Sequence, residues 1–428
     1  MSELPEKSLS ANRDFRRLWL GLAVSQFGSA VGSTALPVVA VGVLHASTIE
    51  VAVLAALGSV TVGISALPVG TFAEFRRKRP VMIGADLLRF AALASVPVAG
   101  WLQLLTFGQL CLVAMLSAFG QLLFQTASQA HLVALVSREQ LVEATGRLQS
   151  TTWLSLAVGP ALGGALVSGL SATTAMLLDG LSFLASAAAV LRLRTAEPAP
   201  PIRSPDASPA RSLGKVSGGL RFVLGRPDLR RLLLSWLVFA GCMGLASPLT
   251  SLLYLRTLRF TPWQYGLILG LPSLAGFAGA RLTGRAGSRF GALRVLRWAG
   301  LLRVPGLVLI ALAPAGGLGV TQCCLGFAAV LLFSSLANSA MTEYRQLATP
   351  EPLLSRVAAL WSLAGTAGQP VFVLLGGLLA SRAGVRAGLA AAAGGALVAG
   401  LMLPSSGRKS RNSSRTGISE SIQALGRK

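Results

Sequence analysis

Two aspartates lie within long apolar stretches of the chain, where an ionised side chain is costly. Asp86 lies about 9 Å into its helix at 1.5 Å per residue, and Arg89 follows it one helical turn later on the same face. We expect these two to form a structural ion pair near the cytoplasmic mouth; the alternative is proton coupling through Asp86. Asp179 has no base near it in the sequence and is the better candidate for protonation. The alternative to this role is that the Asp179 side chain only forms a hydrogen bond to the backbone or to a neighbouring hydroxyl.

Arg303 is the other base deep in an apolar stretch. We expect it to snorkel or to pair across helices, and the alternative is that it holds an anionic substrate.

Polar side chains recur at every fourth position of the apolar stretch 107–130, on one face of a helix. They are Ser117, Gln121, Gln125 and Gln129. The stretch 318–342 carries a second set, offset by 213 positions from the three glutamines: Ser334, Asn338 and Thr342. We expect both sets, with Gln26 of the first apolar stretch, to line a cavity for a small-molecule substrate. The alternative is hydrogen bonding between packed helices, which contributes only ~0.6 kcal/mol per contact.

The composition excludes a soluble globular protein. The 428 residues are 53% hydrophobic and 12% charged, whereas soluble domains carry about 25% charged residues. The net charge of +23 comes from bases in short loops, which fits contact with anionic membrane lipid rather than with nucleic acid. Four cysteines within apolar stretches and two isolated histidines lack metal-ligand spacing, so we expect no disulfide, no metal and no other cofactor. The N-terminus shows no cleavable signal pattern.

Twelve apolar stretches are long enough to cross about 30 Å of hydrocarbon. They are 17–43, 50–72, 81–103, 107–130, 146–169, 172–192, 230–255, 263–284, 293–313, 318–342, 355–380 and 385–404. Nearly all bases lie in the termini, the linker and the loops after even-numbered spans, which places both termini in the cytoplasm. The Ala/Gly/Arg-heavy composition favours a bacterial source, and hence the bacterial inner membrane.

An internal repeat divides these spans into two sets of six. The segment Asp14–Leu18 recurs as Asp228–Leu232, 214 positions later. We therefore expect an all-α membrane protein of two pseudo-symmetric six-helix bundles, with a substrate site between them. The predicted parts are a first bundle (1–193), a proline-rich cytoplasmic linker (194–228), a second bundle (229–404) and a disordered cytoplasmic tail (405–428).

The loop after the second span resembles the signature loop of the major facilitator superfamily, G-x-x-x-D-R-x-G-R-[RK]. Gly70, Lys78 and Arg79 match it, with Glu74 in place of the usual Asp, whereas Phe75 and Arg77 depart from it. The resemblance implies that Glu74 meets the cytoplasmic end of the eleventh span and stabilises one access state. It also implies that the bases, which include Arg76, meet carboxylates or lipid headgroups; the alternative is that they only fix the topology.

The fifth span resembles a motif of drug–proton antiporters in that superfamily, G-x8-G-x3-G-P-x2-G-G. The matching residues are Gly146, Ser155 (in place of one glycine), Gly159, Pro160, Gly163 and Gly164. Small residues permit close helix approach and a proline permits a kink, so the alternative is an ordinary packing seam. The stretches 85–89 and 178–183 are also similar to macrolide and siderophore efflux proteins.

These features predict a secondary transporter that works by alternating access. The resemblance to drug–proton antiporters and to efflux proteins implies that it exports a small amphipathic molecule in exchange for protons. An importer or facilitator of the same fold, and a non-transporting membrane scaffold or sensor, are the alternatives. The chain lacks HExxH, Walker and Ser-His-Asp signatures, so we expect no enzyme and no direct use of ATP. The expected partners are the substrate, protons and membrane lipid, and the expected state is a monomer.

Overall fold

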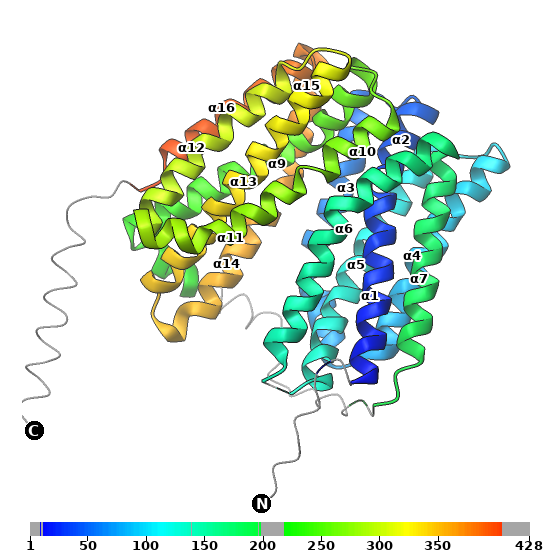
Figure 1. Cartoon of the computed structure of the whole chain (residues 1–428), viewed down its shortest axis with the longest axis horizontal. Coiled ribbons are helices and arrows are strands. Elements are labelled where there is room, and N and C mark those ends of the chain that lie inside the picture. The colour runs from blue at the N-terminus through cyan, green and yellow to red at the C-terminus, as the bar shows by residue number, and fades with distance from the viewer. Residues whose placement is uncertain (1–8, 10–11, 138, 196, 198–217, 405–428) are drawn as a thin grey trace, which may run out of the picture.

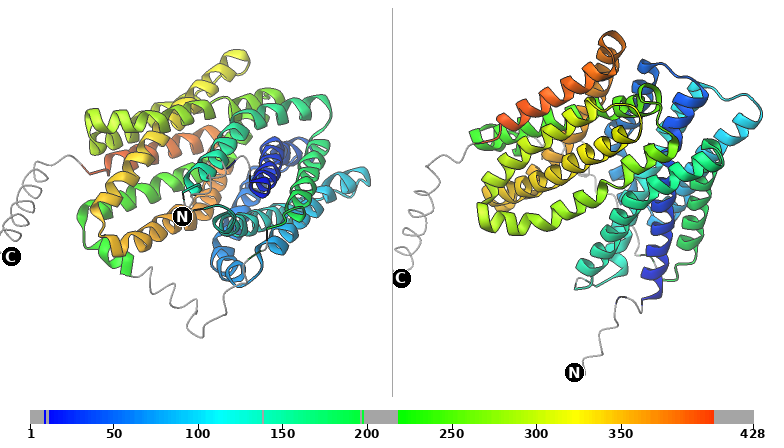
Figure 2. Two further views of the ribbon diagram at one scale, coloured as in Figure 1. Left: turned by 60° about the horizontal axis from the view of Figure 1, so that its bottom comes forward. Right: turned by 45° about the horizontal axis from the view of Figure 1, so that its top comes forward.

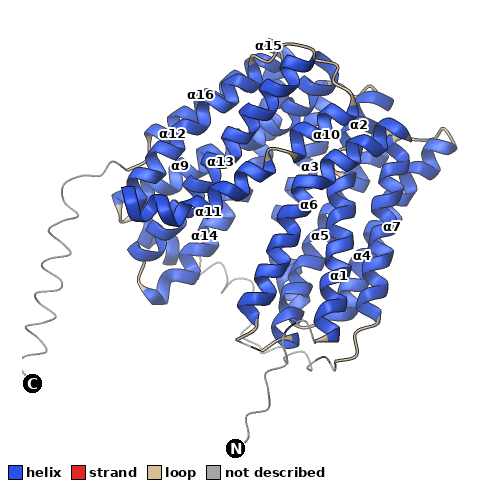
Figure 3. Ribbon diagram, in the orientation of Figure 1, coloured by secondary structure: helices blue, strands red, loops and turns tan. Residues whose placement is uncertain are grey.

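The protein is all-helical in the computed structural model, which describes residues 9, 12–137, 139–195, 197 and 218–404. No strand occurs in these ranges (Figure 3), as the predicted fold class requires. The first set of helices is α1 (Arg13–Gly32), α2 (Ala35–Val38), α3 (Thr48–Glu74), α4 (Lys78–Trp101), α5 (Phe107–Leu135), α6 (Leu141–Gly169) and α7 (Ala172–Leu191). The second set is α9 (Pro227–Leu252), α10 (Pro262–Gly270), α11 (Ser273–Phe290), α12 (Ala292–Ala311), α13 (Gly317–Ala348), α14 (Leu354–Ala367), α15 (Gln369–Ala383) and α16 (Val385–Leu401).

All twelve predicted spans coincide with helices. Ten helical stretches in the described ranges are long and apolar enough to cross a membrane. The other two predicted spans are α12 and α16. The helix α12 contains three arginines, and α16 has only 17 residues, so neither reaches the same combination of length and hydropathy.

The helices form two groups, which we call the N-half (α1–α7) and the C-half (α9–α16). The halves approach each other at the end that carries α2 and α10, and they diverge toward the end where α1 begins (Figure 1; Figure 2). Their main contacts join α6 to α10 and α3 to α15. Most of the predicted linker, 198–217, and the predicted tail lie outside the described residues.

The two halves make the same turn between their first and second spans. Each turn consists of a π-helical segment, a residue with positive φ and a capping box: Val39–Val43, His45 and Ser47 with Glu50 in the N-half, and Leu253–Thr257, Arg259 and Thr261 with Gln264 in the C-half. In each box the side-chain hydroxyl of the first residue accepts a hydrogen bond from a backbone N–H of the next helix. The Glu or Gln side chain in turn accepts a hydrogen bond from the backbone N–H of that first residue. Every equivalent pair is 214 positions apart. The repeat visible in the sequence is thus present in the backbone.

Candidate functional site

A cavity of about 780 Å³ opens within the N-half, bounded mainly by α1, α5 and α6. Its polar lining includes the predicted residues Gln26, Gln121, Gln125 and Gln129. Ser117, the first member of the predicted set on α5, does not line it, and its hydroxyl is buried without a hydrogen-bond partner. Thr152 of α6 donates a hydrogen bond of 2.9 Å to the Gln26 amide oxygen, which fixes one end of that side chain. Phe124 and Leu156 add apolar surface. We call this space the N-half cavity; its mixed lining suits an amphipathic molecule.

A second space, of about 410 Å³, joins the two halves. Gln121 and Gln125 line it from the N-half, and Thr366 and Gln369 line it from the C-half. The sequence analysis missed the latter two residues. A signal was present, because Gln369 stands beside Pro370 at the break between α14 and α15, and a polar residue at a helix break in a membrane marks a site.

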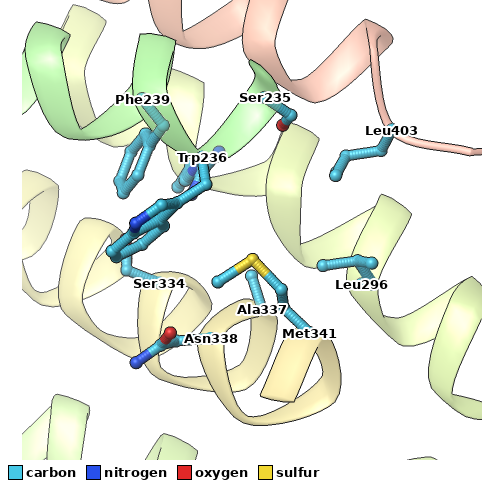
Figure 4. A pocket seen from close by; sticks show the side chains of 10 residues that line it. Ser235, Trp236, Phe239, Leu296, Ser334, Ala337, Asn338, Met341 and Leu403 are labelled. Atoms are coloured by element: carbon cyan, nitrogen blue, oxygen red, sulfur yellow. The ribbon is translucent and has the colours of Figure 1, made fainter. Parts of the chain in front are cut away.

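The C-half has its own small pocket, of about 20 Å³, which we call the C-half pocket (Figure 4). The predicted residues Ser334 and Asn338 of α13 line it, together with Trp236 and Phe239 of α9. Thr342, the third member of the predicted set, does not line it; its hydroxyl donates to the backbone oxygen of Asn338 at 2.9 Å.

A buried charged cluster lies behind one wall of the N-half cavity and reaches the cavity through Arg89. Arg89 of α4 lines this cavity, donates to the Ser29 hydroxyl at 3.1 Å and stacks 3.7 Å from the centre of the Phe183 ring. It interacts electrostatically with Asp179 and with Asp86. Both aspartates and Arg89 are buried. The structure therefore gathers the two aspartates, far apart in the sequence, around one arginine.

The predicted ion pair between Asp86 and Arg89 is wrong as a direct contact. The ion pairs among the described residues are Arg17 with Asp14 and Arg147 with Glu143. Residues three positions apart on a helix can form an ion pair, but the Arg89 guanidinium turns toward α1 and α7 instead. Both carboxylate oxygens of Asp86 are left buried without a hydrogen-bond partner.

Glycines bring Asp179 close to α1. A Cβ at Gly32 would overlap the Asp179 carboxylate, and a Cβ at Gly28 would overlap the neighbouring Ser182. One Asp179 oxygen is buried without a hydrogen-bond partner. The absence of a base beside it in the sequence was therefore misleading, because Arg89 is supplied by another helix.

The glycine motif of α6 contacts two different helices. Gly159 and Gly163 pack against α1, where added Cβ atoms would overlap Ala30 and the backbone oxygen of Val31. Gly164 packs against α10 of the other half. Pro160 and Ser155 are also buried, and Ser155 lines the N-half cavity. A Cβ at Gly146 would meet nothing within 4 Å.

The basic loop after α3 contacts the chain segment that follows α7. The Arg79 guanidinium donates to the backbone oxygens of Leu193 and Thr195, and Glu197 accepts from the backbone of Lys78. The ammonium of Lys78 donates to three backbone oxygens, those of Ala73 and Glu74 at the end of α3 and that of Arg76 in the turn after it.

The side chain of Glu74 is exposed and forms no hydrogen bond or ion pair with any residue that the structure describes. Arg76 stacks 5.6 Å from the centre of the Phe72 ring, and a Cβ at Gly70 would meet nothing within 4 Å. The implied contact of Glu74 with the eleventh span is therefore not made in this conformation, in which the halves diverge at that end.

The chain has relatives among exporters. It is 26% identical over 351 residues to the multidrug efflux pump Tap of Mycolicibacterium fortuitum, which covers 80% of this chain and 83% of that protein. It is 26% identical over 407 residues to the enterobactin exporter EntS of Escherichia coli, over 92% of each chain.

Solved transporter structures share the fold. A bacterial homologue of the iron transporter ferroportin in an inward-facing state superposes with a TM-score of 0.73 at 17% identity, over 93% of this chain and 98% of that one. The nucleoside transporter NupG gives a TM-score of 0.73 at 11% identity, over 91% and 98%. Residues 18–349 match the family model of the Major Facilitator Superfamily. The chain therefore belongs to the Major Facilitator Superfamily and is a multi-pass membrane transporter rather than an enzyme.

Proposed function

We propose that this protein exports a small amphipathic molecule across the bacterial inner membrane in exchange for protons. The observation that carries this proposal is the buried cluster of Asp86, Arg89 and Asp179, which reaches the N-half cavity through Arg89. With all three groups ionised, two carboxylates face one guanidinium, so the cluster has one negative charge in excess. A neutral carboxylic acid is much less costly to bury than a carboxylate, so one bound proton balances the cluster.

The position of this cluster supports coupling between proton and substrate. Arg89 contacts the cavity directly, and its guanidinium links α4 to α1 through Ser29. A change of charge on Asp179 or Asp86 alters the forces on Arg89, and hence the fit of α1 against α4 and α7. We assign the exchangeable proton to Asp179, which interacts with Arg89, and the Asp179→Asn variant tests this choice against Asp86.

The arrangement of the halves supports loading from the cytoplasm. With both termini cytoplasmic, the diverging end faces the cytoplasm and the joined end faces outward (Figure 1). In this arrangement residues 1–193 and 229–404 rock about the contacts of α6 with α10 and of α3 with α15, as in other alternating-access transporters. The segment 194–228 links the two halves, and one chain transports the substrate as a monomer.

The direction of transport rests on the relatives. Proteins named as a multidrug efflux pump and as an enterobactin exporter are similar over most of this chain. The glutamines and apolar side chains of the N-half cavity fit the same kind of cargo, an organic molecule with both polar and apolar faces.

Inverted membrane vesicles test the proposal. The full chain is expressed, the vesicle interior is acidified, and a panel of amphipathic antibiotics and enterobactin is added while a pH-sensitive dye reports proton release. We expect at least one compound to release protons and to accumulate in the vesicles. Accumulation without proton movement would identify a different energy source, and movement only down the compound's own gradient would identify a facilitator.

A further inference from the structure

Arg303 of α12 is a buried cation in the C-half, and its surroundings differ from those of Arg89, the buried arginine of the N-half. It is 5% exposed, and its Cζ lies 3.2 Å from the centre of the Phe239 ring. Its Nε donates to the backbone oxygen of Gly300 at 3.1 Å, and this is its one hydrogen bond within the described part of the chain. A guanidinium has five N–H donors, so most of its donor capacity is unused.

The internal repeat shows what is missing around Arg303. It lies 214 positions after Arg89, the offset that relates the two halves. At the same offset, Gly300 stands where Asp86 stood and Ala393 where Asp179 stood. The C-half has therefore kept the buried cation and has neither carboxylate. In the described ranges Arg303 forms no ion pair with any carboxylate.

Stacking on Phe239 stabilises the guanidinium only partly, because burial removes its hydration without supplying an opposite charge. A leucine or methionine would fill this position at lower cost if packing were the only requirement. An arginine that is buried, unpaired and beside a cavity is thus placed to receive an anion from outside the protein fold.

The C-half pocket lies beside this guanidinium and offers suitable partners. Arg303 itself lines it, with Ser334, Asn338 and Trp236 around the same space (Figure 4). The Ser334 hydroxyl is buried without a hydrogen-bond partner, and Asn338 is exposed at the pocket. The volume of about 20 Å³ exceeds the roughly 10–15 Å³ that one water requires. The pocket therefore admits about one oxygen atom of a charged group, while the rest of the molecule stays outside.

The geometry points to the C-half pocket as a binding site for the oxyanion group of an amphipathic organic anion, held by Arg303, Ser334 and Asn338. A carboxylate, sulfonate or phosphate matches the fork of a guanidinium, and Arg is the side chain best suited to such groups. This inference rests on the proposed function, since it names the class of molecule that the transporter carries: acids with an apolar body. The same chemistry could come from the phosphate of a lipid, and the experiment separates the two sources.

Equilibrium binding to the full-length protein in phosphatidylcholine nanodiscs tests the site. The probes are 8-anilinonaphthalene-1-sulfonate and the uncharged N-phenyl-1-naphthylamine, which share a fluorophore and differ in the sulfonate. Signals are corrected with empty nanodiscs. We expect Arg303→Gln to raise the Kd of the sulfonate at least about tenfold, the factor equivalent to a charge-assisted contact, and to leave the uncharged probe unchanged. For Arg303→Lys, the Kd of the sulfonate should lie between the values of the unsubstituted protein and of Arg303→Gln.

Two further variants keep the test decisive. Asn338→Asp places a carboxylate at an exposed position of the pocket, so it should weaken binding of the sulfonate probe but not of the uncharged probe. This variant tests the site even if Arg303→Gln does not fold. Arg281→Gln removes another arginine stacked on a phenylalanine, Phe277 at 4.9 Å, but one that does not line the pocket; it should change neither Kd. Equal changes for both probes, or unchanged sulfonate binding in folded Arg303→Gln, would overturn the proposal.

Added phosphatidylglycerol identifies the source of the anion. Competition with the sulfonate that depends on Arg303 would assign the pocket to lipid phosphate, and its absence would assign the pocket to a soluble acid. The assay uses no gradient and measures no transport. Failure of proton-coupled export in vesicles would therefore leave the binding result standing, and loss of the binding site would leave the export result standing.

Discussion

Gly164 of α6 and Gly266 of α10 face each other where the two halves join. A Cβ on Gly164 would overlap the backbone oxygen of Pro262 and would lie 3.1 Å from the Cα of Gly266. A Cβ on Gly266 would overlap the backbone oxygen of Pro160 and would lie 3.1 Å from the Cα of Gly164. The contact is thus reciprocal, and it brings two backbones closer than any side chain would permit.

Gly164→Val should force this joined end apart. Because the clash is with backbone, it can be relieved only by moving the helices, so we expect a population shift toward a state open at that end and a loss of transport. Distances between spin labels on α6 and α10 would show the shift. Gly169→Val is the matched control on α6, since a Cβ there meets nothing within 4 Å. Unchanged distances in Gly164→Val would show that the seam does not hold the halves together.

Asp179→Asn should abolish proton coupling. The amide has nearly the shape of the acid but cannot exchange a proton, so substrate-dependent proton release should fall to the level of empty vesicles while substrate binding persists. Glu143→Gln is the control, because Glu143 is an exposed acid paired with Arg147 on the surface of α6. Transport against a gradient by Asp179→Asn would move the coupling role to Asp86 or elsewhere.

Gln125→Leu should change substrate preference more than protein abundance. The side chain is exposed to both the N-half cavity and the space between the halves, so its loss removes a polar contact without disturbing a packed core. Ratios of transport rates across a set of substrates should shift at least severalfold, whereas Gln346→Leu, at the end of α13 and outside these cavities, should leave them unchanged. Poor expression with unchanged ratios would instead indicate a packing role.

Gly120→Ala should destabilise the protein by about 1–3 kcal/mol, the usual cost of overpacking. A Cβ at Gly120 would lie 2.6 Å from Cγ of Arg89 and 3.2 Å from the backbone oxygen of Ala85, so it would displace the arginine of the charged cluster. The Tm of the purified protein in detergent would fall.

The control for this substitution lies on the same helix and should not lower the Tm. A Cβ at Gly108 meets nothing within 4 Å, and alanine is the better helix former, so Gly108→Ala should leave the Tm unchanged or raise it slightly. A Tm of Gly120→Ala equal to that of Gly108→Ala would show that Arg89 can move aside without cost.

The order and type of the elements could be predicted from the sequence because they depend on local properties. The length of an apolar run determines whether it can span a membrane, and all twelve predicted runs are helical. The offset of 214 positions predicted a repeat, and it recurs in the turns at His45 and Arg259. Gln121, Gln125 and Gln129 are spaced four apart and so share one helix face, and all three line the N-half cavity. Their role in binding a substrate stays a prediction.

The direction of individual side chains depended on tertiary structure, because it is set by helices distant in the sequence. Arg89 does not pair with Asp86, one turn away, since Ser29 and the Phe183 ring on other helices hold its guanidinium. Thr342 follows the spacing of Asn338 but does not reach the C-half pocket. Sequence alone therefore determined which residues are in the membrane and on which helix. Packing between distant helices decided which charges met, because a guanidinium is held by the hydrogen-bond acceptors and aromatic rings that neighbouring helices bring to it.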